Sequence, residues 1–210
     1  MGPMGARPGV VGRVGPCIAV AALLTGAPCG PGGPEPLAAQ STEQSAQVTA
    51  QPLRWQVDGA SVTFEIHNFG LPVRGTFGSL DADLSFDPER PETGSLAATV
   101  DPATIRTGIE MRDRHLRGRD YFHVEKYGAI ELRSVRIQRS GVGYSGTFRL
   151  RIRDVEREVE IPFQFEALDS TARVSGSLTL DRLDYGIGRP SPILADEVTV
   201  AVVLRLRRDR

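Results

Sequence analysis

Cysteine is nearly absent from this chain of 210 residues, and lysine is rarer still. Both cysteines, Cys17 and Cys29, lie near the amino terminus, and Lys126 is the single lysine. If a leader that contains both cysteines is removed, the mature chain has no disulfide, no cysteine nucleophile and no cysteine metal ligand. An excess of one charge is also missing, because 25 Lys and Arg residues stand against 26 Asp and Glu residues. This balance gives no bulk electrostatic case for binding nucleic acid.

A hydrophobic run long enough to span a bilayer is missing as well. The apolar run at residues 14–27 follows Arg7 and Arg13, and it is too short and too rich in glycine and proline for that purpose. Its length suits the apolar region of a signal peptide. We therefore expect residues 1–39 to be a signal peptide, residues 40–52 to be a flexible lead-in, and the mature protein to be periplasmic or secreted. A lipidated Cys29 and a cytoplasmic extension are the alternatives.

The motifs of the common enzyme classes are also missing. The chain has no nucleophile elbow, P-loop, dinucleotide fingerprint or paired-carboxylate motif. Its histidines, His67, His115 and His123, do not form a metal-ligand spacing. We therefore expect no cofactor, no metal and no enzymatic activity. An exported enzyme that isomerises or hydrolyses a lipid is the alternative, because an enzyme need not carry a familiar motif.

What the sequence does have is a long alternation of apolar and polar residues. Phe64 and Ile66, for example, share one parity, as expected for strands with one buried face. The apolar parity flips after Gly78 and again near Ser134, which predicts a bend or a bulge at each position. About eight to ten such strands predict an all-β domain over residues 53–208, either a sandwich or a closed barrel.

Residues 148–163 predict a hairpin with its loop at residues 154–157. Charges on its outward face exclude an outer-membrane barrel, because a charge at mid-bilayer costs roughly 2–4 kcal/mol. The apolar face must then point inward, and we expect the barrel to be soluble. The predicted register pairs apolar with apolar residues and opposite charges with each other: Ile152 with Val159, Leu150 with Ile161, Phe148 with Phe163, Arg153 with Glu158 and Arg151 with Glu160.

The alternation is interrupted at residues 105–127 by a run dense in charge, where we expect a short helix over residues 120–126. This run resembles the central motif of the YceI-like polyisoprenoid-binding family, and weaker matches flank it in the family's order. The central match is Thr107-Gly108-Ile109, Arg112-Asp113-x-His115-Leu116-Arg117 and Asp120-Tyr121-Phe122-x-Val124-Glu125-Lys126-Tyr127. The flanking matches are Val62-x-Phe64-x-Ile66-x-Asn68 with Val73-x-Gly75-x-Phe77, and Arg182-Leu183-Asp184-Tyr185-Gly186-Ile187.

The resemblance implies a lipocalin-like eight-stranded antiparallel β-barrel with a short helix beside its opening. Members of the family are typically small periplasmic or secreted proteins that hold an isoprenoid chain, such as a quinone tail or a polyprenyl phosphate, in an apolar cavity. We therefore expect an isoprenoid lipid as the partner and no nucleic acid, with transient membrane contact and a homodimer left open. The expected ligand-binding residues are Phe64, Ile66, Phe77, Leu84, Leu150 and Ile161 in the cavity and Arg112, Asp113 and His115 at its rim.

Two questions stay open in the sequence. Arg112 and His115 could meet a phosphate or quinone head group together with Asp113, or Asp113 could only orient Arg112 or cap the following turn. The barrel could be hollow, or it could be filled with side chains as in a scaffold protein. Small residues of inward parity favour the hollow barrel: Gly75, Ala82, Ala98, Gly146 and Gly176.

Overall fold

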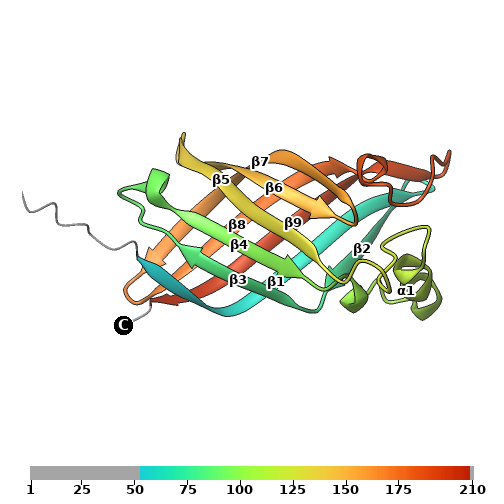
Figure 1. The fold of residues 1–210 in the computed structure, drawn as a ribbon, viewed down its shortest axis with the longest axis horizontal. Coiled ribbons are helices and arrows are strands. Elements are labelled where there is room, and N and C mark those ends of the chain that lie inside the picture. The colour runs from blue at the N-terminus through green and yellow to red at the C-terminus, as the bar shows by residue number, and fades with distance from the viewer. Residues whose placement is uncertain (1–52, 209–210) are drawn as a thin grey trace, which may run out of the picture. The chain divides into compact units, whose positions relative to one another are not determined.

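A computed structural model describes residues 53–208 as one antiparallel sheet that closes on itself (Figure 1). One α-helix and three short 3₁₀ segments lie between the strands. The strands are β1 (Arg54–Asn68), β2 (Leu71–Phe77), β3 (Leu80–Ser85), β4 (Ser95–Val100), β5 (Ile130–Ser140), β6 (Gly143–Ile152), β7 (Val155–Leu168), β8 (Thr171–Asp181) and β9 (Leu194–Arg208). The helix is α1 (Glu110–Arg117), and the 3₁₀ segments are Pro91–Thr93, Pro102–Thr104 and Leu183–Tyr185.

The strand order is β2-β1-β3-β4-β5-β6-β7-β8-β9, and pairing of β1 with β9 closes the sheet. On its other side β1 pairs with two strands. β2 pairs with the second half of β1, and β3 pairs only with Arg54 and Trp55 of β1. β2 and β3 therefore occupy one position in the wall between them. The result is the predicted closed barrel of eight antiparallel strands.

Both predicted irregularities are present. The parity flip after Gly78 marks a bend, with β2 ending at Phe77 and β3 beginning at Leu80. The second flip is a bulge in β5, where the register with β6 shifts between Ser134 and Arg136. The extra residue, Val135, is 49% exposed, whereas Ile137 returns to the interior.

An aromatic cluster packs at the end of the barrel at which β1 begins and β9 finishes, and we call this the closed end. The Trp55 indole nitrogen donates a hydrogen bond to the carbonyl oxygen of Phe86 at 2.9 Å. The Phe86 ring lies edge-on to Tyr144, with ring centroids 5.0 Å apart, and 4.8 Å from Phe165. The opposite end holds α1, the β1–β2 turn and the β8–β9 connection, and we call it the mouth (Figure 1).

The predicted helix at residues 120–126 is wrong, because the helix lies earlier at Glu110–Arg117. Glu110 in its first turn and Arg117 in its last turn complement the helix dipole. The later stretch is a series of turns in which His123 takes a φ of 47°, a value that a right-handed helix does not allow. Between residues 53 and 208, no helix has the length and apolar character needed to cross a membrane.

The predicted register of the β6–β7 hairpin is also wrong. The turn consists of Arg153 and Asp154, so that Ile152 faces Val155 and Leu150 faces Arg157. The pairing is shifted by an even number of residues, which leaves every side chain on its predicted face. Arg157, which was expected in the turn, is instead a strand residue, and its guanidinium lies 3.2 Å from the Asp184 carboxylate at the mouth. The charge pair at Glu158 is then formed by Arg149, at 3.6 Å, and not by Arg153.

Candidate ligand-binding cavity

The barrel is hollow, with a cavity of about 800 Å³. Inward-facing aliphatic and aromatic side chains from all nine strands form its wall. Polar residues among the lining come from the mouth: Asn68, Thr107, Arg112, His115, Asp120, Arg182, Arg189 and Ser191. A space of this size is within the range of pockets that hold small organic ligands, roughly 300–1,000 Å³.

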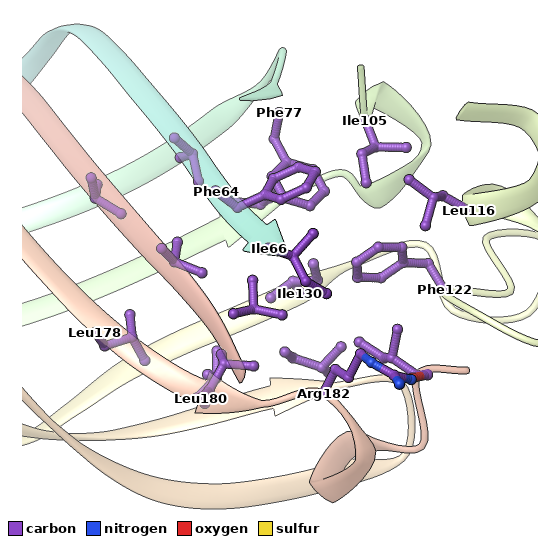
Figure 2. Close-up of a pocket in the computed structure, with 18 of the residues that line it drawn as sticks. Phe64, Ile66, Phe77, Ile105, Leu116, Phe122, Ile130, Leu178, Leu180 and Arg182 are labelled. Carbon is purple, nitrogen blue, oxygen red and sulfur yellow. The ribbon is translucent and has the colours of Figure 1, made fainter. Parts of the chain in front are cut away.

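All six predicted cavity residues line this space. Phe64, Ile66 and Phe77 extend from β1 and β2 toward Leu178 and Leu180 of β8 on the other side (Figure 2). Leu84 of β3, Leu150 of β6 and Ile161 of β7 are buried. The alternation of apolar residues was therefore a sufficient guide to this part of the lining.

Of the three inward glycines, Gly176 lines the cavity as expected, whereas Gly75 and Gly146 have a different role. A Cβ on Gly75 would lie 2.3 Å from the Phe64 ring, and one on Gly146 would lie 2.4 Å from the Phe148 ring. These two glycines therefore make room for neighbouring phenylalanine rings against the wall. Ala98 lines the open space directly, as predicted.

Arg112 and Asp113, two of the residues predicted at the rim, form hydrogen bonds with Thr107. Asp113 is 5% exposed, and its carboxylate accepts hydrogen bonds from the backbone nitrogen of Thr107, at 2.8 Å, and from the Thr107 hydroxyl. Arg112 donates from Nε to the Thr107 hydroxyl at 2.7 Å and from Nη2 to the Thr107 carbonyl at 2.8 Å. The hydrogen bond from the Thr107 hydroxyl is the main cause that holds the pKa of Asp113 below its ordinary value, against the opposing effect of burial.

Asp113 thus faces Thr107, while Arg112 and His115 line the cavity. The His115 ring lies edge-on to Tyr121, with centroids 5.0 Å apart. Arg117, at the end of α1, donates hydrogen bonds to the carbonyls of Ala103 and Ile105 at 2.8 and 3.0 Å. Because these bonds fix both ends of α1, the helix presents Arg112 and His115 to the mouth.

The β8–β9 connection is organised by Arg182, which is 2% exposed. Its guanidinium donates to the carbonyls of Ala195, Ile187 and Arg189 at 2.9–3.0 Å, and to the Asp196 carboxylate at 2.6 Å. A buried guanidinium is tolerated because its donors have partners.

Residues 55–206 match the model of the YceI-like domain, which is well over half of the chain. The chain belongs to the YceI-like family. It is 31% identical over 136 residues to a UPF0312 protein of Ectopseudomonas mendocina, a match that covers 61% of this chain and 71% of the relative. A UPF0312 protein of Photorhabdus laumondii is 32% identical over 101 residues, covering 48% of this chain and 53% of the relative.

Solved structures of YceI-like proteins have the same fold. BcnA of Burkholderia cenocepacia aligns with a TM-score of 0.69 at 26% identity, covering 71% of this chain and 99% of BcnA. A polyisoprenoid-binding domain from Saccharophagus degradans, implicated in plant cell wall breakdown, aligns with a TM-score of 0.57 at 14% identity. That match covers 75% of this chain and 99% of the domain.

Sequence reasoning missed part of the lining of this YceI-like barrel. Ile105, Leu116 and Phe122, from the segment around α1, project over the mouth end of the cavity (Figure 2). Phe122 lies edge-on to Phe77, with centroids 5.8 Å apart. No strand alternation marks these residues, because they reach the cavity from turns and a helix.

Proposed function

We propose that this YceI-like protein binds the apolar chain of an isoprenoid lipid inside its barrel and carries it without changing it chemically. One observation supports this most strongly: the cavity of about 800 Å³ has an almost wholly apolar wall. A polar ligand placed there would lose its hydrogen bonds to water without replacement, whereas each buried CH₂ group gains up to about 0.8 kcal/mol. The fold shared with a polyisoprenoid-binding domain points to the same ligand class.

The lining favours one orientation of the lipid. Its polar residues come from the mouth, and the closed end contains the aromatic cluster around Phe86. We therefore place the tail toward the closed end and the head group, of the quinone or polyprenyl phosphate type, at the mouth. Arg112, whose orientation is fixed by Thr107, is suited to bind an anionic head group there.

The proposed carrier acts outside the cytoplasm, after removal of residues 1–39. Support for this comes from the basic and then apolar composition of the leader, which lies outside the described residues. The position of Asp113 supports binding without catalysis, because its carboxylate faces Thr107 and does not line the cavity beside His115.

The cavity volume sets the length of tail that can be enclosed. If a CH₂-sized group takes the space of a water molecule, about 30 Å³, a cavity of about 800 Å³ holds roughly 25 such groups. This corresponds to about five isoprene units. A longer tail would leave its remaining units at the mouth, where burial adds no further affinity.

We therefore expect the affinity for polyprenyl phosphates to rise with tail length up to about five isoprene units and then to level off. The rise should be roughly tenfold or more per added unit, because each unit buries several carbon groups. Titration of delipidated protein against a series of tail lengths, followed by displacement of a fluorescent polyene lipid, measures this. An affinity that does not depend on tail length would refute the proposed function.

A further inference from the structure

We infer that the mouth of the barrel docks on the surface of a lipid bilayer, from which the tail passes into the cavity. The inference rests on the proposed function and adds a partner to it. Five exposed apolar side chains at the mouth form the docking surface, and we call them the apolar rim: Phe69, Leu71, Ile109, Met111 and Ile193.

The apolar rim gathers most of the exposed large apolar side chains on one end of the molecule. Of the eight such side chains between residues 53 and 208, these five lie at the mouth. Met111 is 79% exposed, Phe69 71% and Leu71 69%. They come from the β1–β2 turn, the start of α1 and the β8–β9 connection, which share one end of the barrel (Figure 1). A concentration of this kind marks a surface that a partner covers.

The apolar rim is continuous with the cavity. Ile109, Met111 and Ile193 are exposed to solvent and also line the cavity. The backbone nitrogen of Phe69 donates a hydrogen bond of 2.7 Å to the carbonyl of Ile193, which joins the β1–β2 turn to this edge. A lipid tail that leaves a bilayer at the mouth can therefore reach the interior along apolar side chains.

The backbone of the β1–β2 turn also indicates a function for Phe69. Phe69 and Gly70 have φ angles of 52° and 73°, in the left-handed region. Glycine, asparagine and aspartate are the residues usually found in such turns, and a phenylalanine there is strained. Because its ring is exposed, packing against the protein does not compensate for the strain. On the proposed docking surface, burial of the ring in the bilayer interface would offset it.

The charges around the apolar rim suit the anionic surface of a bilayer. In residues 105–127 the exposed basic side chains are Arg106, Arg114, Arg119 and Lys126, against the exposed acidic side chains of Glu110, Asp120 and Glu125. Exposed apolar side chains flanked by basic residues are the usual composition of a surface that lies on anionic lipid.

Tryptophan quenching tests the docking directly. In the full chain, Phe69→Trp or Leu71→Trp places an indole on the apolar rim, and Val142→Trp places one on the β5–β6 turn at the closed end. Each variant also contains the native Trp55, so quenching is measured relative to the unchanged chain. Vesicles of brominated phosphatidylcholine and phosphatidylglycerol in equal parts should quench the added indole of the two rim variants and not the added indole of Val142→Trp. Equal quenching at both ends, or none at the rim, would overturn the inference. If the leader itself binds the vesicles, it does so in every variant, and the comparison between the variants still holds.

Lipid uptake separates this inference from the proposed function. The double variant Phe69→Ser with Leu71→Ser should take up a polyprenyl phosphate from those vesicles roughly tenfold more slowly than the unchanged chain. Its affinity for the same lipid delivered in detergent should be unchanged, because neither residue lines the cavity. If the unchanged chain does not bind the lipid from detergent, the proposed function fails. If it binds, but uptake from vesicles is the same in both proteins, docking alone is refuted.

Discussion

Replacing Ala98 with tryptophan is expected to weaken binding of the isoprenoid lipid about fiftyfold. Ala98 lies on β4 with its side chain in the cavity, between Ala82 of β3 and Leu132 of β5. An indole at this position would occupy space that the tail needs. If about three CH₂ groups are displaced at about 0.8 kcal/mol each, the loss of binding free energy is about 2.4 kcal/mol. The polyene displacement titration measures the change in affinity.

The matched control is the neighbouring residue, Ala97, on the same strand. Its side chain points outward, because successive residues of a strand face opposite sides, and it lies between Asp83 and Arg133. Ala97→Trp should leave the affinity unchanged. An equal loss in both variants would mean that tryptophan disturbs β4 itself, and an unchanged affinity in Ala98→Trp would mean that the lipid does not occupy the cavity.

Replacing Arg182 with methionine is expected to destabilise the barrel by about 3 kcal/mol, which is the second large effect. The change removes the donors for three backbone carbonyls and for the Asp196 carboxylate in the β8–β9 connection. The carboxylate is itself part-exposed, so water can replace some of the lost interaction. Denaturant unfolding followed by circular dichroism measures the free energy of unfolding.

Arg189 in the same connection provides the comparison. Its side chain is 86% exposed and lies 3.9 Å from Asp120, a surface pair of small energetic value. Arg189→Met should therefore change the free energy of unfolding by less than about 0.5 kcal/mol. If the two variants lose the same stability, the buried hydrogen bonds of Arg182 do not organise the connection.

Much of this fold could be predicted from the sequence, because one rule determines which side chains face inward. The alternation identified the cavity face of β1, β6 and β7 and located the bulge at Ser134. The register of β6 with β7 could not be predicted in the same way. Several pairings keep the same faces, so the alternation alone does not choose between them.

The mouth was harder to predict for a similar reason. α1 has only eight residues, and its position depends on tertiary bonds such as those from Arg117 to Ala103 and Ile105. The helix predicted from the sequence lies too late in this segment, because the charged residues of the segment form no clear amphipathic pattern. The position of Asp113 likewise depends on Thr107, and the apolar rim becomes evident only when three separate segments meet.

Native mass spectrometry of the protein purified from its own host tests the central claim, that the barrel holds a lipid tail, most directly. The account predicts one apolar adduct per chain, with a mass in the range of an isoprenoid lipid, which is lost when the protein is denatured. The same preparation of Ala98→Trp should lack it, and that of Ala97→Trp should retain it. A bare mature chain as the only species in the unchanged protein would contradict the account.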